Sequence, residues 1–198
     1  MIRHPILLAC EALCALAFSA VAQLTPARPP PKPPALHFSL SALGEHELDD
    51  GSWQGADLLR EPDAQIDRFQ LTIRPDQAAQ LAVDVVDDAG TQRLYPPPGQ
   101  DGRLRAETTY ALPGPHGFYE LVGRAHLRIS LRPTGDAADG PLPPALPLAE
   151  MSVQPFRLSD GSPFTSMERA FAAPRGASLD LQLRSHQGVV TPTPPATE

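Results

Sequence analysis

Hydrophobic and polar residues alternate along much of the chain between residues 36 and 187. This period of two is typical of a β-strand that buries one face. The clearest runs place three apolar residues at alternate positions, and they cover 36–40, 69–73, 81–85, 127–131 and 179–183. Further strands are expected at 92–95, 104–112, 118–122 and 152–158. The pattern therefore predicts a chain built mainly from short strands.

Turn-forming residues separate these runs. Clusters of Asp, Gly, Ser and Pro occupy 87–90, 98–102, 113–117 and 159–162. Short strands divided by turns indicate a β-sandwich or a barrel. We predict an all-β fold, an antiparallel β-sandwich or partly open barrel with long Pro/Gly-rich loops, the longest at 134–148. Single helical turns are expected only at 56–60 and at 75–80, where Pro75 has a permitted first position.

Residues 1–22 have the pattern of a secretory signal peptide. Arg3 precedes an apolar run at 6–21, and Ala20-Val21-Ala22 has the small-x-small form of a cleavage site, so the mature chain is expected to begin at Gln23. The run is too short for a spanning helix, so no transmembrane span is expected after cleavage. The prediction is a periplasmic or secreted bacterial protein, with a lipoprotein anchored through Cys10 as the alternative.

The rest of the chain divides by composition. The chain has 198 residues and 25 prolines, a length typical of one domain. Residues 23–35 form a Pro-rich linker of polyproline II character. A single β domain is expected at 36–187, followed by a disordered Pro/Thr-rich tail at 188–198.

The charge of the chain limits its partners. The formal net charge is −7, and Lys32 is the only lysine. Nucleic acids and anionic membrane surfaces reward clustered Lys and Arg, so neither is an expected partner. Both cysteines, Cys10 and Cys14, lie in the predicted signal peptide, which excludes thiol chemistry from the mature chain.

Residues 66–133 carry motifs in a familiar order. The run 71–76 is followed by 81–90, which ends in Asp-Asp-Ala-Gly, and then by Leu94-Tyr95-Pro96. With Leu112-Pro113 as a strand end and 123–130 as a closing strand, this order resembles the bacterial domain of unknown function 4384 family. The resemblance implies a non-enzymatic accessory domain of an envelope or signalling protein.

We find no constellation that carries chemistry. Residues 45–50, Glu-His-Glu-Leu-Asp-Asp, lack the spacing of a zinc or calcium site and are interpreted as a solvated charge run. Asp84 belongs to the polar face of a strand, and Asp87 and Asp88 to a hairpin turn. Ser52 follows its glycine directly and so misses the nucleophile elbow. We therefore predict no catalytic residue, no metal ligand and no cofactor site.

Two residues are candidates for contact with a ligand or partner. Trp53, between Gly51 and Gly55, is expected to be exposed in a loop. Gln182 lies on the outward face of the last strand, which is either a closing strand paired on both sides or a sheet edge open to a partner. The leading hypothesis is an exported, non-catalytic β-module that binds another envelope protein or a cell-wall glycan. The alternative is a hydrolase with a scattered active site.

Overall fold

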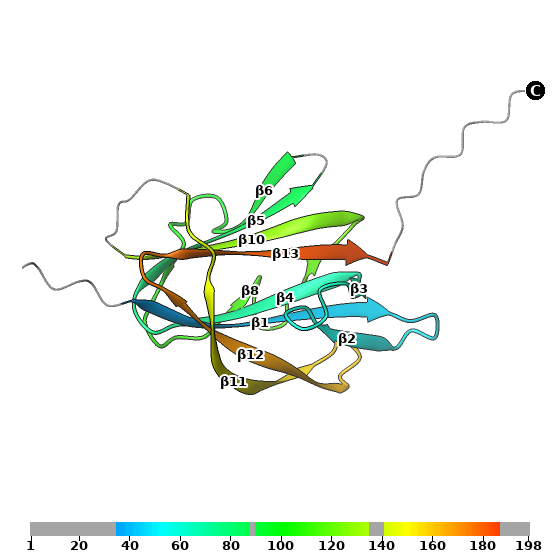
Figure 1. Cartoon of the computed structure of the whole chain (residues 1–198). Helices are drawn as coiled ribbons and strands as arrows, with labels where there is room; N and C mark the ends of the chain where they lie inside the picture. The colour runs from blue at the N-terminus through cyan, green and yellow to red at the C-terminus, as the bar shows by residue number, and fades with distance from the viewer. Residues whose placement is uncertain (1–34, 88–89, 135–140, 187–198) are drawn as a thin grey trace, which may run out of the picture. The chain divides into compact units, whose positions relative to one another are not determined.

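The computed structural model describes residues 35–87, 90–134 and 141–186, and every regular element in them is a β-strand (Figure 1). The strands form two sheets that share one hydrophobic core and are not closed into a barrel. The predicted all-β fold is confirmed, and its architecture is that of a β-sandwich.

The larger sheet has the strand order β11-β12-β1-β4-β8, with β2 also beside β1 and β9 also beside β4. Its strands are β1 (Leu36–Glu47), β2 (Trp53–Asp57), β4 (Arg68–Pro75), β8 (Tyr110–Leu112), β9 (Tyr119–Glu120), β11 (Leu146–Arg157) and β12 (Pro163–Ala173). All of its pairings are antiparallel.

The smaller sheet has the order β3-β13-β10-β5-β6, with β7 also beside β5. Its strands are β3 (Gln65–Ile66), β5 (Ala79–Asp87), β6 (Gly90–Tyr95), β7 (Arg103–Leu104), β10 (Arg124–Pro133) and β13 (Ala177–Ser185). Only the short contact of β3 with β13 is parallel.

The alternating runs supply the core between the sheets. Leu36, Phe38 and Leu40 of β1 are buried together with the apolar residues of β4, β5 and β10. In β13, Leu183 is buried, and Leu179 and Leu181 are partly buried against the same core. The strand prediction at these runs is therefore confirmed, because one side chain in two points inward.

Of the two predicted helical turns, the one at 75–80 is wrong, and the one at 56–60 is shifted: residues 58–60 form a turn in which the Glu61 N–H donates to the Asp57 carbonyl at 2.8 Å. Residues 56–57 end β2, Pro75 ends β4, and Ala79 begins β5. Ala56 pairs with Gly44, and Ala79 is fully buried opposite Leu104. Burial of these small residues in sheet positions outweighs the weak local preference for a helical turn.

Three other boundaries also differ. The strand expected at 104–112 is split into β7 and β8 by a turn, and the one expected at 118–122 is reduced to β9. The loop expected at 134–148 ends earlier, because β11 begins at Leu146. The strand β12 was not predicted, since its sequence PFTSMERAFAA lacks regular alternation.

Several predictions lie outside the described residues. These are the signal peptide, the cleavage site before Gln23, the Pro-rich linker and the C-terminal tail. Within the part of the chain that the structure describes, no helix has the length and apolar character needed to cross a membrane.

Candidate binding site on the outer face of the larger sheet

The outer face of the larger sheet has two different halves. Along one edge of β1, β12 pairs with residues 36–40, and β2 pairs with residues 43–47. Beyond its contact with β1, β12 crosses over β2: a side chain at Gly55 would meet the Phe164 ring at 2.6 Å, and Asp57 Oδ2 accepts the Met167 N–H at 2.8 Å. Figure 1 shows the β11–β12 hairpin curving away below β1 and β2. The hairpin therefore covers one half of this face and leaves the other half open.

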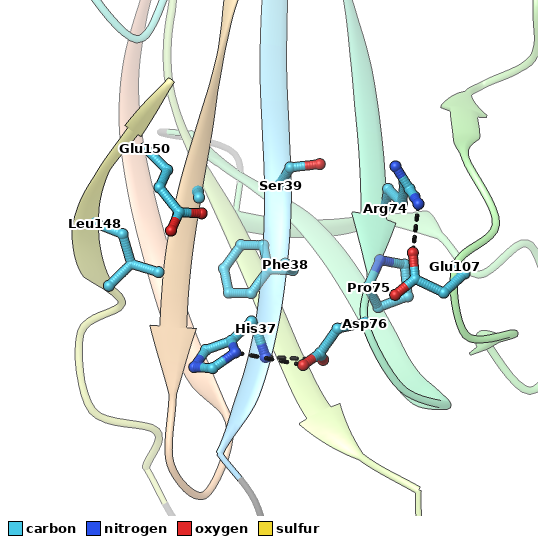
Figure 2. A pocket seen from close by; sticks show the side chains of 10 residues that line it. His37, Phe38, Ser39, Arg74, Pro75, Asp76, Glu107, Leu148 and Glu150 are labelled. Atoms are coloured by element: carbon cyan, nitrogen blue, oxygen red, sulfur yellow. Dashed lines mark hydrogen bonds and ion pairs between the residues drawn. The ribbon is translucent and has the colours of Figure 1, made fainter. Parts of the chain in front are cut away.

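The open half holds a shallow cleft of about 280 Å³ over β1, β4 and the hairpin (Figure 2). Its charged lining residues are His37, Arg74, Asp76, Glu107 and Glu150. If His37 is neutral, one guanidinium faces three carboxylates. The cleft is therefore polar and acidic, and wide open to solvent.

His37 and Asp76 form a clamp at one end of the cleft. The Asp76 carboxylate accepts the backbone N–H of His37 at 2.8 Å and lies 3.4 Å from His37 Nδ1. In return, the backbone N–H of Asp76 donates to the His37 carbonyl at 2.9 Å. These contacts fix the start of β1 to the end of β4.

Arg74 and Glu107 form an ion pair on another side of the cleft. Glu107 has a φ of +54°, a left-handed conformation that is uncommon for a residue other than glycine. Its backbone N–H donates to the Pro75 carbonyl at 2.8 Å, which holds the turn against β4. The turn that divides β7 from β8 thus presents its carboxylate to the cleft (Figure 2).

Glu150 is placed by a β-bulge. The register between β11 and β12 shifts between Pro147 and Met151, and the extra residues bring Leu148 and Glu150 to the cleft. Figure 2 shows the Glu150 carboxylate pointing from the hairpin towards β1. In the described residues this carboxylate has no hydrogen-bond or ion-pair partner, so it is free to meet a ligand.

Glu168 ties the hairpin to the sheet beside the cleft. Its carboxylate accepts hydrogen bonds from Ser39 Oγ at 2.5 Å, Ser152 Oγ at 2.6 Å and Gln154 Nε2 at 3.1 Å. Burial acts to raise the pKa of Glu168, but these three hydrogen bonds and the charge of Arg74 together hold that pKa below its ordinary value of 4.5. Glu168 is therefore an ionised, structural carboxylate.

Glu45 lies in the covered half and overturns one expectation. Its side chain is 0% exposed, whereas residues 45–50 were interpreted as a solvated run; only 47–50 are exposed. Glu45 Oε2 accepts hydrogen bonds from Arg68 Nε at 2.9 Å and from Ser159 Oγ at 2.7 Å. The reason is the hairpin, which brings Ser159 over a strand face that the sequence alone would leave in water.

Trp53 is the first residue of β2 and is not in a loop. It is only partly exposed, because the Arg68 guanidinium lies 3.4 Å from the centre of its ring, with the Phe118 ring 4.8 Å from the same guanidinium. The expected exposed loop position is therefore wrong, although contact with a partner remains a prediction. Gln182 is exposed on β13, so the two candidate residues lie in different sheets.

A second cluster forms where β1 ends. His46 Nδ1 lies 2.8 Å from Asp67 Oδ2, and the His46 and His186 rings have centroids 4.1 Å apart. Burial acts to raise the pKa of Asp67, but the Glu47 N–H, the hydrogen bond with His46 and the charges of both histidines hold it below its ordinary value of 3.8. No metal-binding group of three or more His, Cys, Asp or Glu occurs within the described ranges.

The other carboxylates have the ordinary places that the sequence predicted. Asp84 is in β5 and pairs with Arg93, and the Asp87 carboxylate accepts the Gly90 N–H at 3.1 Å beside the β5–β6 turn. The cleft itself was missed. His37 and Ser39 were recognisable as the polar positions of an alternating strand, but no sequence signal brings Glu107 and Glu150 to them.

No protein-family model, no curated protein and no solved structure matches this chain. The resemblance of residues 66–133 to the domain of unknown function 4384 family stays a prediction.

Proposed function

We propose that this chain is an exported, non-catalytic β-module that binds another envelope protein or a cell-wall component in the cleft over β1. The observation that carries the proposal is the cleft itself, an open and shallow hollow on a sheet face in which the Glu150 carboxylate has no partner among the described residues. Binding modules present such surfaces, whereas active sites are deeper and enclose their reacting groups.

The lining of the cleft supports binding over catalysis. His37 is held by Asp76, and Arg74 is held by Glu107, so these side chains are fixed before a ligand arrives. Fixed polar groups lose little conformational freedom on binding. Among the described lining residues, no hydroxyl or thiol nucleophile is hydrogen-bonded to His37.

The charge of the cleft favours a basic ligand group. Three carboxylates against one guanidinium attract an amino or guanidinium group, such as an exposed basic residue of an envelope protein or a free amine of a cell-wall peptide. Glu150 supplies the unpaired charge. The surrounding His37–Asp76 and Arg74–Glu107 pairs add hydrogen-bond donors and acceptors, which fix the orientation of the ligand.

The test compares binding by the unmodified protein and by Glu150→Gln. Isolated cell-wall sacculi and fractionated envelope proteins are the two probes, and binding is measured at low and at moderate salt. Loss of an exposed charge contact of about 1 kcal/mol weakens binding about fivefold. Glu61→Gln, an exposed carboxylate in a turn away from the cleft, is the matched control and should bind normally. Equal binding by both variants contradicts a role for the cleft.

Export is tested separately, by the mass of the N-terminus after expression in a bacterium that retains its secretion machinery. The expected mature chain begins at Gln23. A retained 1–22 segment, or a lipid on Cys10, contradicts a cleaved signal peptide.

A hydrolase is the second candidate, and one observation favours it. The His46–Asp67 pair has the arrangement of a general base and the carboxylate that orients it. The His186 ring packs against the face of the His46 ring, with the two ring planes tilted by 39°. Turnover of an ester, amide or glycoside substrate that is lost in His46→Gln would establish this function.

A further inference from the structure

β11 is the edge strand of the larger sheet, and it is exposed along its length. Met151 and Val153 are each 60% exposed, and Leu146 and Leu148 are also exposed. Four of the six exposed large hydrophobic residues among the described positions therefore lie on this one strand. An apolar edge strand with unpaired backbone groups is a template for pairing with another strand.

The direction of the backbone groups along β11 follows from its hairpin. Leu158 donates its N–H to the Ser162 carbonyl, and Arg157 pairs with Pro163, so even-numbered residues after the bulge point their backbone groups at β12. Odd-numbered residues then point theirs away from the sheet. Within the described part of the chain, Met151 and Val153 each present an unpaired N–H and C=O at this edge, whereas Pro155 presents only a C=O.

Pro155 confirms this direction independently. A proline is tolerated in a strand where its missing N–H would face away from the neighbouring strand. Because Pro155 has no N–H to donate, it ends the row of outward-facing backbone hydrogen-bonding groups on one side, and the bulge before Met151 ends that row on the other side. Met151 and Val153 are therefore the two residues of this edge that can both donate and accept a backbone hydrogen bond, and this short segment is called the slot.

We propose that a second copy of this chain occupies the slot, with the two β11 strands antiparallel about a two-fold axis at Ser152. This register pairs Met151 with the other copy's Val153 and the reverse, and each pair exchanges two hydrogen bonds. An axis at Val153 would place Met151 opposite Pro155, which lacks an N–H. An axis at Met151 would place Val153 opposite the bulge.

The side chains agree with this register. Met151 and Val153 lie on one face of β11, so the dimer joins four apolar side chains that are exposed in the single copy. On the other face, Ser152 meets its own copy and Glu150 meets Gln154, so no like charges are opposed. An identical patch on both copies is what two-fold symmetry requires. The interface is small, so the dimer is of the weak, reversible class.

The first test is a disulfide at the axis. In a chain carrying Cys10→Ser and Cys14→Ser, Ser152→Cys places the two sulfurs across a narrow pair with Cα atoms about 4.5 Å apart, within disulfide range. Gln154→Cys is the register control, because its two copies would lie roughly 13 Å apart. Val122→Cys, at a position 78% exposed in a loop, is the control for random collision. Only Ser152→Cys should crosslink rapidly under mild oxidation.

The second test is sedimentation equilibrium over a wide range of concentration. The unmodified chain should show a reversible monomer–dimer equilibrium. Val153→Asp should raise its dissociation constant at least about tenfold, because it places a carboxylate against the apolar Met151 side chain of the other copy. Because Val153 is exposed, the variant should keep the melting temperature of the monomer. A monomer at every concentration, a dimer that Val153→Asp leaves unchanged, or equal crosslinking at 122 and 152 each overturns the proposal. Both tests use the protein alone, with no ligand for the cleft, so failure of the dimer and failure of the proposed function are distinguishable.

Discussion

Replacing Glu45 by alanine leaves the Arg68 charge without its partner in the covered half of the larger sheet. Both groups are removed from water to different degrees: Glu45 is 0% exposed, and the Arg68 side chain is 17% exposed. Removing one partner of a buried ion pair typically costs about 3–5 kcal/mol. Arg68 keeps some hydration and its contact with Trp53, so we expect the lower end, about 3 kcal/mol.

An unpaired oxygen of Glu45 reduces the net contribution of the ion pair to stability, but it does not reduce the cost of removing Glu45 alone. Glu45 Oε1 is buried and has no hydrogen-bond partner in the described residues, so the native state already carries a desolvation penalty. This desolvation penalty disappears when the Glu45 carboxylate is removed, whereas the Arg68 charge remains without its partner. The double variant with Arg68→Ala should therefore be more stable than the sum of the single losses, by roughly 1–3 kcal/mol.

Urea and thermal unfolding measure the effect. For a domain of this size, a loss of about 3 kcal/mol lowers the melting temperature by roughly 6–12 °C. Glu47→Ala, two residues along the same face of β1 but exposed, is the matched control and should leave stability unchanged. If Glu45→Ala unfolds at the same temperature as Glu47→Ala, the buried ion pair does not stabilise the fold and the reasoning fails.

Three further predictions follow from single contacts. Arg68→Gln should shift the emission of Trp53, the only tryptophan, to longer wavelength because the ring loses its cover; an unchanged spectrum contradicts the stacking. Gln182→Pro should fold, because the Ser178 N–H donates to the Pro143 carbonyl on the side away from β10 and Gln182, at even spacing from Ser178, directs its N–H to that same side, whereas His126→Pro, directly opposite in the paired strand β10, should unfold; if the folded Gln182→Pro variant binds its partner unchanged, that edge is not the binding site. The stability lost in Glu168→Gln should be greatest at neutral pH and shrink as the pH falls below 4.5, because the lowered pKa of Glu168 stabilises the fold only while the carboxylate is ionised; a difference that is constant with pH contradicts it.

The sheet core could be predicted because its sequence signal is local. Leu127, Ile129 and Leu131 alternate with polar residues, and each of the three is buried as the alternation requires. The same signal placed β4, β5 and most of β13. A strand with one solvent-exposed face and one buried face can be recognised from a single run of residues.

The covered half of the larger sheet could not be predicted for the opposite reason. Leu43 and Leu158 are buried outside the main core, on the outer side of β1 where a polar position is expected. Their burial depends on the hairpin, which approaches closely because Gly55 has no side chain to meet Phe164. Such contacts join residues more than a hundred positions apart, and no local pattern records them.

The path of β12 also decides where a ligand can reach the sheet. β12 stays beside β1 as far as Leu40 and then crosses over β2, so it fills the face near Glu45 and leaves the face near His37 uncovered. Glu168 holds the strand at this point of divergence through Ser39 and Ser152. The same bulge that lets β11 follow this curve brings Glu150 to the cleft. The cleft is thus a geometric consequence of the hairpin leaving the sheet, and a substitution that weakens the Glu168 contacts should alter binding in the cleft before it unfolds the core.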